Sequence, residues 1–394
     1  MNKKTLICSV ILLLGFNFYG SVFLTVPNSI IKIIILVSIA WGWMKMNKNT
    51  LLSKPLIWML FFLIISCLSS MIFREQNFIR TFLASNISYS LLLYFFFTAI
   101  APSNKQCDKI IVILSTLYCV SYIIQLAVIP VQLFKLDEFM LEGNTTRLRL
   151  AGSALATLGY FYSLNKLLTE KNKLYIFLLI ITLFTILLMG FRTILVAIAI
   201  SSFIYLLSIN KIKLESTFIF AIMIISAYIL INNTEWGRNV FNGMIERQKE
   251  ETFSNKDYVR WIGFDAYWNH YLDTFEKLFG IGSAYENSPN ENDITSGKIG
   301  AGAVWVDWGI VGLSFYNGII TCIIQVYCII KLIFTRIKPQ YKYLQIWLFT
   351  ILLCSVTTGE YIRLGNTAVI AFVLYWIEQN KIKYENSRRF NYYN

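Results

Sequence analysis

Apolar runs follow one another along most of this chain, with short polar connections between them. A helix needs about 20 predominantly apolar residues to cross the hydrocarbon core of a bilayer. The runs are 6–26, 30–44, 55–73, 86–100, 110–129, 150–164, 174–189, 193–207, 217–231, 304–330, 344–355 and 364–377. The pattern predicts an all-α polytopic membrane protein with about twelve transmembrane helices, the first of which is a retained helix and not a cleaved signal peptide.

The runs are uninterrupted, and they do not alternate between apolar and polar positions as the strands of a membrane barrel do. Because a backbone inside lipid must satisfy its own hydrogen bonds, these runs are expected to be helices. The composition agrees, since 56% of the residues are hydrophobic and 14% are charged. Soluble domains carry roughly 25% charged residues, so the composition excludes a soluble fold and favours a single transmembrane domain over residues 1–394.

The net charge of +13 comes mostly from lysines, and most of these lie in every second loop. The cytoplasmic side of a membrane protein is the one whose short loops are enriched in Lys and Arg. With the amino terminus in the cytoplasm, every Lys-rich loop is cytoplasmic, and so are both termini. These loops carry Lys45, Lys48, Lys54, Lys105, Lys109, Lys166, Lys171, Lys173, Lys211, Lys213, Lys331, Lys338 and Lys342. The charge therefore indicates orientation, and no nucleic-acid partner is expected.

One connection is much longer than the others. Residues 232–302, between the ninth and tenth predicted helices, form a polar loop on the extracytoplasmic side, and a connection of this length is usually functional. Within it, residues 260–279 place aromatic and apolar side chains on one arc at helical spacing, which predicts an amphipathic helix at the membrane interface. The arc consists of Trp261, Phe264, Trp268, Tyr271, Leu272, Phe275 and Phe279.

Sequence motifs for metal, nucleotide and disulfide chemistry are absent. The seven cysteines lie in apolar runs or in loops predicted to be cytoplasmic, so they indicate neither disulfides nor a metal site. The chain has no Asp-x-Asp pair, no histidine cluster and no Gly-x-x-x-x-Gly-Lys loop. The sequence therefore predicts no metal ion and no other cofactor, and it indicates neither ATP nor a metal-bound nucleotide sugar as substrate.

Arginine is distributed differently from lysine, because most arginines fall on the predicted outer side. They are Arg74, Arg80, Arg147, Arg149, Arg192, Arg238, Arg247, Arg260 and Arg363. The outer lysines are Lys135, Lys249, Lys256, Lys277 and Lys298. The positive-inside rule predicts that both Lys and Arg are rare in outer loops, so it does not explain the outer arginines. A guanidinium is planar and always charged and grips phosphate through two parallel hydrogen bonds, which favours phosphate binding.

Four outer arginines are candidates for this role. Arg192 lies in a tight turn between two apolar runs with no acidic residue beside it in the sequence, and snorkelling to the interface is the alternative. Arg147 and Arg149 directly precede the sixth predicted helix, where the alternative is an interfacial anchor paired with Glu142. Arg260 begins the amphipathic helix, where a cation opposes the helix dipole, so an acidic ligand or partner is favoured.

Two side chains are candidates for a general base. His270 is the only histidine and lies on the polar arc of 260–279, and simple surface exposure is the alternative. Asp307 lies where the chain re-enters the membrane, and it would be a base, an orienting acid or the cap of a helix start. Glu360 and Arg363, three residues apart in the last outer loop, are expected to pair with each other.

Five short segments lie on the predicted outer side of the membrane and are distinctive in sequence. They are Arg147-Leu148-Arg149-Leu150-Ala151-Gly152, Gly190-Phe191-Arg192, Arg260-Trp261-Ile262-Gly263-Phe264, Leu278-Phe279-Gly280-Ile281-Gly282 and Val306-Asp307-Trp308-Gly309-Ile310-Val311-Gly312-Leu313. Together with the helix layout over most of the chain, this set resembles the O-antigen polymerase and ligase superfamily of bacterial envelope glycan enzymes. The last segment resembles the acid-x-Gly-x-x-Gly pattern of that family.

The resemblance implies a multi-pass glycosyltransferase of the bacterial inner membrane that acts in O-antigen lipopolysaccharide or capsular polysaccharide biosynthesis. Its donor and acceptor would be glycans linked to undecaprenyl pyrophosphate, joined on the outer face without a metal ion. A chain-length regulator and a flippase are the implied protein partners. The implied residues for binding pyrophosphate and glycan are Arg147, Arg149, Arg192 and Arg260. The implied catalytic residues are Asp307 and His270.

Two other functions stay open. A ligase of the same superfamily typically has a His shortly before the acid-x-Gly segment, whereas Lys298 and Gly300 lie there in this chain, which favours a polymerase. A flippase or transporter of lipid-linked glycans is the alternative from another class. Transporters tend to have paired repeats and ionisable groups at the membrane midplane, whereas the apolar runs of this chain are nearly free of charge.

Arg192→Lys is expected to abolish glycan transfer although the positive charge is kept, because the point charge of an ammonium does not replace the planar fork of a guanidinium. A gel of envelope glycans from a strain that carries only this variant measures the effect. A fully active Arg192→Lys variant would remove the main argument for pyrophosphate binding.

Overall fold

The computed structural model describes residues 2–24, 26–46, 49–142, 145–170, 175–208, 259–295, 305–355 and 359–392. Side chains are described within the same ranges except at 137–147, 259–260, 294–295, 306–307 and 382–392. Only the backbone is therefore described at Arg147, Arg260 and Asp307. The predicted helix over 217–231 and much of the predicted loop over 232–302 lie outside the described residues.

Helices make up most of the described chain, and every predicted apolar run within it coincides with one or more of them. The first group is α1 (Lys3–Gly15), α2 (Asn17–Gly20), α3 (Asn28–Lys45), α4 (Ser53–Phe73), α5 (Phe78–Ala84), α6 (Asn86–Tyr89), α7 (Leu93–Ile100), α8 (Asn104–Ala127), α9 (Ala154–Glu170), α10 (Tyr175–Met189) and α11 (Arg192–Ser208). The second group is α14 (Val259–Asp265), α15 (Thr274–Phe279), α16 (Pro289–Thr295), α17 (Gly309–Ile333), α18 (Lys342–Ser355) and α19 (Asn366–Tyr392). Short helical turns are η1 (Ser90–Leu92), η2 (Ala266–Tyr271), η3 (Trp305–Trp308), η4 (Pro339–Tyr341) and η5 (Glu360–Ile362).

Four of the described helices, α3, α4, α8 and α17, are long and apolar enough to cross a membrane. The pair formed by α5 and Asn86–Ile100 is bent by 56° and would be a fifth span if it crosses as one unit. Helices α3, α4 and α8 also expose large apolar side chains, among them Val37, Trp58 and Leu117, as helices in contact with lipid do. These are the properties of a multi-pass membrane protein, and the total of about twelve spans stays a prediction.

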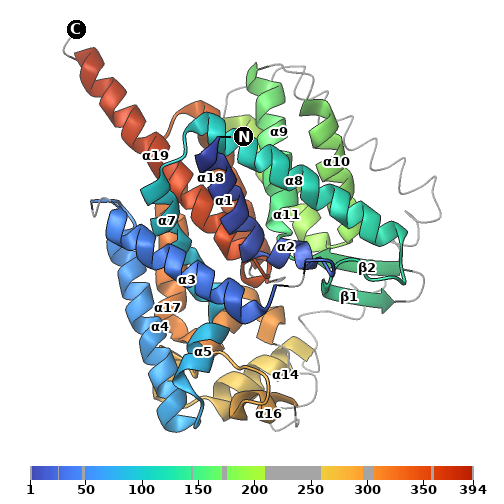
Figure 1. Ribbon diagram of the computed structural model, residues 1–394, viewed down its shortest axis with the longest axis vertical. Helices are drawn as coiled ribbons and strands as arrows, with labels where there is room; N and C mark the ends of the chain where they lie inside the picture. The colour runs from blue at the N-terminus through green and yellow to red at the C-terminus, as the bar shows by residue number, and fades with distance from the viewer. Residues whose placement is uncertain are drawn as a thin grey trace.

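The core of the bundle is built around α19. Residues 368–377 of this helix are buried at every position, and α19 contacts α1, α7, α9, α17 and α18 (Figure 1). The ring of Phe372, for example, packs edge-on against that of Phe97 with 5.2 Å between their centres. A helix that is apolar on all sides belongs in a core or a membrane, and this one lies among other helices of the same chain.

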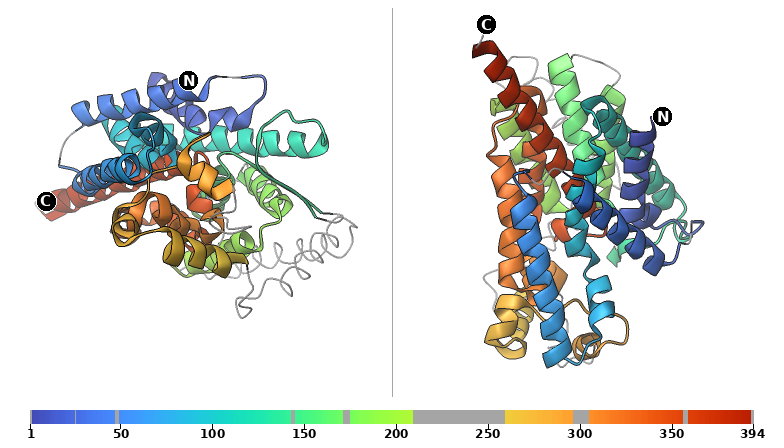
Figure 2. Two further views of the ribbon diagram at one scale, coloured as in Figure 1. Left: turned by 90° about the horizontal axis from the view of Figure 1, so that it is seen from below. Right: turned by 60° about the vertical axis from the view of Figure 1, so that its left-hand side comes forward.

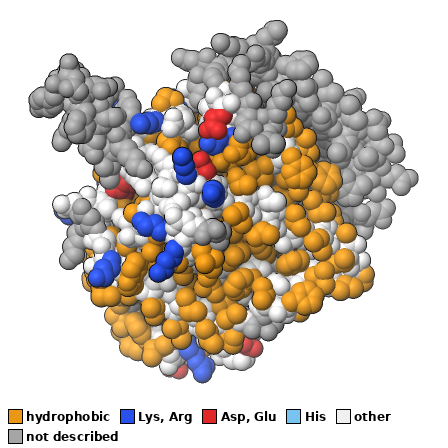
Figure 3. Space-filling view, turned by 45° about the horizontal axis from the view of Figure 1, so that its top comes forward, with side chains coloured by type: hydrophobic (Ala, Val, Ile, Leu, Met, Phe, Trp, Pro, Cys, Tyr) orange, Lys and Arg blue, Asp and Glu red, His pale blue; other side chains and the backbone are white. Residues whose placement is uncertain are grey.

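Both termini lie toward one end of the molecule, and residues 259–295 lie toward the opposite end (Figures 1 and 2). Loops predicted to be cytoplasmic meet near the termini: the Asn104 amide donates to the Tyr341 hydroxyl at 2.6 Å and to the Asn380 side chain at 3.1 Å. The Lys166 amine likewise donates to the Asp108 carboxylate at 3.3 Å. Figure 3 shows Lys and Arg side chains gathered in one region of the surface turned toward this end. Loops expected to share one side of the membrane thus share one end of the molecule.

The prediction of a single helix over residues 6–26 is wrong. Helix α1 ends at Gly15, and four consecutive residues from Asn17 have positive φ. After this turn, Ser21 pairs with Phe134 in an isolated antiparallel bridge. The helix therefore ends because the chain pairs with a distant segment, which an apolar run does not reveal.

One hairpin is an exception to the all-α prediction. Strand β1 (Leu136–Glu142) pairs antiparallel with β2 (Thr145–Leu150), and these are the only strands in the described part of the chain. Three successive side chains at the end of β2, those of Leu148, Arg149 and Leu150, are fully buried. The hairpin thus places an arginine inside the protein at the position where the sequence predicts an outer loop.

The prediction of one amphipathic helix over 260–279 is also wrong, because two helices lie there. Helix α14 continues into η2, the chain becomes extended at Leu272, and α15 follows Asp273. The Asp273 carboxylate accepts a hydrogen bond from the backbone N of Glu276 at 2.8 Å, and the Glu276 carboxylate accepts one from the backbone N of Asp273 at 3.1 Å. This reciprocal capping box starts a new helix.

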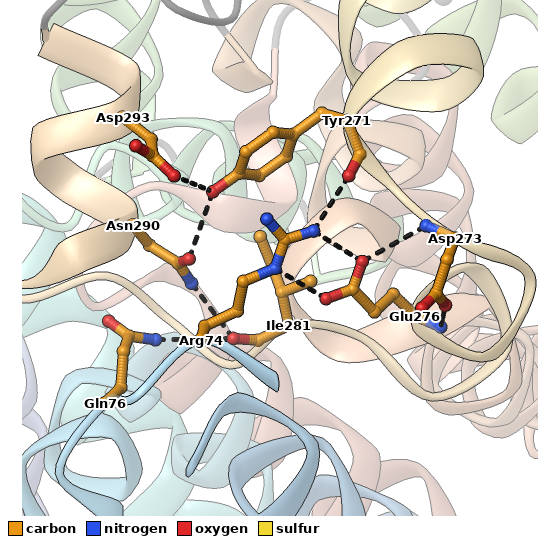
Figure 4. Close-up of polar contacts among 8 residues, drawn as sticks. All are labelled: Arg74, Gln76, Tyr271, Asp273, Glu276, Ile281, Asn290 and Asp293. Carbon is orange, nitrogen blue, oxygen red and sulfur yellow. Dashed lines mark hydrogen bonds and ion pairs between the residues drawn. The ribbon is translucent and has the colours of Figure 1, made fainter. Parts of the chain in front are cut away.

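Arg74 fastens this segment to the end of α4 (Figure 4). Its Nε and Nη2 donate to the two carboxylate oxygens of Glu276, both at 2.6 Å, and Nη2 also donates to the carbonyl oxygen of Tyr271 at 2.8 Å. Burial lowers the pKa of Arg74, but the hydrogen bond and charge of Glu276 outweigh burial, so that the pKa lies above its ordinary value. At this arginine, which is predicted to lie on the outer side, the planar fork grips a carboxylate of the protein itself.

Arg74→Met is expected to loosen residues 259–295, because the Glu276 side chain is only 2% exposed and would lose its two-bond partner. A buried charge left without its partner costs about 3–5 kcal/mol. Limited proteolysis in detergent, followed by mapping of the cleavage sites, measures the loosening. Arg336→Met, at an exposed arginine in the connection between α17 and α18, is the control, and equal protection of the segment in both variants would contradict this role of Arg74.

Candidate functional site

A buried ion pair lies where β2 meets two turns of the bundle. The Arg149 side chain has no exposed surface, and its Nη1 lies 3.5 Å from Oε2 of Glu360, whose side chain is 1% exposed. The guanidinium carbon also lies 3.7 Å from the ring centre of Phe191, within cation–π range. Arg149 therefore joins the hairpin to η5 and to residues 189–192, which we call the arginine turn because Arg192 ends it.

Hydrogen bonds fix the Glu360 carboxylate on its other side. Its Oε1 accepts from the Ser153 hydroxyl at 2.5 Å and from the Asn366 side-chain amide at 3.1 Å. Asn366 is itself held, because its Oδ1 accepts from the backbone N of Ala154 at 3.0 Å. A buried carboxylate is costly unless it has such partners. The starts of α9 and α19 are thereby joined to η5.

The segment that contains Asp307 passes beside the turn that carries Glu360. Gly309 begins α17 with a φ of +55°, and a Cβ at this position would lie 1.8 Å from the carbonyl oxygen of Ser355 and 3.3 Å from the backbone N of Gly359. Only glycine permits both this conformation and this approach. The contact gives a physical reason for the first glycine of the acid-x-Gly-x-x-Gly segment, and it places η3 next to the turn that carries Glu360.

Aromatic side chains join α14 to η3 and α17. The ring centre of Trp308 lies 5.3 Å from that of Trp261 and 4.9 Å from that of Phe264. Further along, Tyr267 stacks on Phe315 with 4.8 Å between ring centres. Burial raises the pKa of the Tyr267 phenol to about 12, so it is neutral at physiological pH. Part of the predicted aromatic arc therefore holds α14 and η2 on the bundle.

Four of the predicted site residues lie on these connected elements, and the structure describes the backbone of each of them. Arg192 follows Phe191 and begins α11, and its side chain is partly exposed. Asp307 lies in η3 and Arg260 in α14, which the aromatic contacts join. Arg147 lies in β2, two residues before the buried arginine. The side chains of Arg147, Arg260 and Asp307 lie outside the described residues.

The other two predicted site residues have contrasting environments. Arg149 has no exposed surface, so its guanidinium faces protein groups and direct phosphate contact would require a rearrangement. His270 is 72% exposed, and its Nδ1 lies 3.1 Å from the carbonyl oxygen of Asp265 and 3.4 Å from the carboxylate of the same residue. This exposure agrees with the interpretation of His270 as a simple surface residue. Its role as a base stays a prediction.

Sequence reasoning misses the groups that fix the ion pair. The structure pairs Glu360 with Arg149 from the hairpin, a partner that spacing along the chain does not predict. Phe191 and Ser153 carry a signal in the sequence, because Phe191 lies inside a segment of the resemblance and Ser153 directly follows another. Nothing in the sequence distinguishes Asn366.

No protein-family model matches this chain, and no curated protein matches it either. Within the residues that the structure describes, no group of three or more His, Cys, Asp or Glu side chains is placed to hold a metal ion. The prediction of a metal-independent reaction stays a prediction. The geometry described above is therefore what supports a functional assignment.

Arg149→Met and Glu360→Gln are each expected to lower the free energy of unfolding by about 3–5 kcal/mol, because either change leaves a buried polar or charged group without its partner. The double variant is expected to lose less than the sum of the two single losses, since the side chains are in contact. Thermal unfolding of the purified protein in detergent measures all three variants. Losses that simply add would show that the two side chains do not interact.

Proposed function

We propose that this protein polymerises undecaprenyl-pyrophosphate-linked oligosaccharide repeat units into O-antigen or capsular-type polysaccharide on the outer face of the bacterial inner membrane. In this proposal about twelve helices cross the membrane, with both termini in the cytoplasm and residues 232–302 outside. The supporting observation is that β2, the arginine turn, η5, η3 and α14 form one connected set of contacts.

The position of these elements suits an outer-face reaction. The hairpin and α14 lie away from the end that carries both termini (Figure 1). Between them, these elements carry four of the five segments on which the resemblance rests. The fifth, around Gly280, also packs on the bundle, since the backbone N of Gly282 donates to the carbonyl oxygen of Tyr316 in α17 at 2.8 Å.

The proposed reaction is a single displacement. A sugar hydroxyl of the acceptor attacks the anomeric carbon of the donor glycan and forms the new C–O bond. The bond from that carbon to the pyrophosphate oxygen breaks, and the lipid pyrophosphate leaves with the electron pair. A base takes the proton of the hydroxyl, for which Asp307 and His270 are the candidates.

The arginines would stabilise the leaving group. Arg192 lies at a turn between two apolar helices, and with Arg147 and Arg260 it would neutralise the charge that develops on the pyrophosphate in a partly dehydrated site. We assign Arg149 a positioning role, because its guanidinium lies on Phe191 beside Arg192 and is held by Glu360. The arginine turn would then hold the guanidinium of Arg192 in a fixed position.

The test is a gel of envelope glycans from a deletion strain complemented with wild type, Arg192→Ala or Arg80→Ala at matched protein levels. A single-repeat glycan is expected in the deletion strain, with a ladder restored by wild type and by the control Arg80→Ala but not by Arg192→Ala. Loss of all exported glycan in the deletion strain would point to a flippase, and polymer that is made but not transferred to its final acceptor would point to a ligase.

A further inference from the structure

A cavity of about 350 Å³ lies between α1, α2, α3, α6 and the start of β1. Its apolar side includes Ile31, Ile35 and Leu136. Its polar side is formed by Asn17, Asn28, Lys32, Asn86 and Lys135. None of the arginines assigned above lines it, so it is a separate feature of the fold.

The two lysines of this cavity come from distant parts of the chain. Lys32 lies near the start of α3 and is half-buried. Lys135 directly precedes β1, and its backbone N donates to the carbonyl oxygen of Gly20 at 2.6 Å. The neighbouring bridge between Ser21 and Phe134 fixes this approach. The tertiary fold therefore brings two positive charges to one cavity.

Among the described side chains, the cavity has positive charge without matching negative charge. No Asp or Glu whose side chain the structure describes lines it. Within the described part of the chain, neither lysine amine has a hydrogen-bonding or ion-pair partner, whereas Lys166 at the other end of the molecule pairs with Asp108 and Glu170. Lys135 is exposed, whereas Lys32 is half-buried. Because burying an ammonium without a partner is costly, an anion bound beside Lys32 would offset that cost.

The same cavity lies beside a surface suited to lipid. On α3, Ile33 and Val37 follow Lys32 and are 52% and 62% exposed. A ligand with a phosphate head and a long apolar chain could place its head at the lysines and its chain along this helix. A polyprenyl phosphate or pyrophosphate has both parts.

The cavity also shares a wall with the candidate site. Ala151 and Leu364 line it, and the backbone N of Gly152 donates to the carbonyl oxygen of Leu364 at 2.9 Å. The next residue, Ser153, donates to the Glu360 carboxylate. The segment that lines the cavity at Ala151 is thus continuous with the residue that holds the buried ion pair.

We propose that this cavity binds the phosphate head of a polyprenyl phosphate or pyrophosphate lipid through Lys32 and Lys135. The inference rests on the proposed function, because a polymerase must hold two lipid-linked glycans at once. The arginine turn then holds the pyrophosphate of the donor, and the cavity holds that of the acceptor.

The test measures binding of undecaprenyl phosphate to the full chain in nanodiscs. Lys32→Gln and Lys135→Gln are each expected to weaken binding about tenfold, as the loss of a charge-assisted hydrogen bond does. Lys32→Arg is expected to keep binding, and Lys45→Gln, at the other end of α3, is the matched control with binding unchanged. The thermal unfolding temperature of each variant shows that the fold is retained.

Phosphatidylglycerol and inorganic pyrophosphate serve as competitors that separate the polyprenyl lipid from other sources of phosphate. Unchanged binding in the double lysine variant, or displacement by either competitor at equal concentration, would overturn the inference. A wild-type protein that binds the lipid through these lysines but yields no ladder in the gel would overturn the proposed function and leave this site standing. A ladder from a protein whose lipid binding does not depend on the lysines would overturn this inference and leave the proposed function standing.

Discussion

Two charged side chains sealed from solvent, those of Arg149 and Glu360, join the hairpin, the arginine turn and η5 in one arrangement. Removing both charges from water is costly, and the cost is offset only where their partners are well placed. Here the partners are the Phe191 ring, the Ser153 hydroxyl and the Asn366 amide. Because these groups come from the arginine turn and from the starts of α9 and α19, the pair forms only when those parts of the chain are in position.

Much of the fold can be predicted from the sequence, because lipid and a lipid-facing bundle both require long apolar helices. The predicted runs within the described residues coincide with helices for this reason. The breaks are harder to predict, since the chain turns after α1 and then pairs at Ser21 with the distant Phe134. The start of α15 has a local signal in Asp273 and Glu276, whose spacing is that of a capping box, but the aromatic periodicity across the break conceals it.

The candidate site can be predicted only in part. The segments around Arg149, Arg192 and Asp307 are recognisable by their local pattern, and the structure places them on connected elements. The pairing of Arg149 with Glu360 joins residues far apart in the sequence, so spacing along the chain favours a nearby partner for Glu360. The cavity at Lys32 cannot be predicted from the sequence for the same reason. Its other lysine, Lys135, reaches the cavity because Ser21 pairs with Phe134.

The most direct measurement of the central claim uses the purified chain reconstituted in liposomes with a defined undecaprenyl-pyrophosphate-linked oligosaccharide and no other protein. The account predicts a ladder of polymer and the release of one undecaprenyl pyrophosphate for each new glycosidic bond, because that lipid is the leaving group. Movement of the intact lipid-linked glycan between the leaflets, with no new bond and no released carrier, would contradict it.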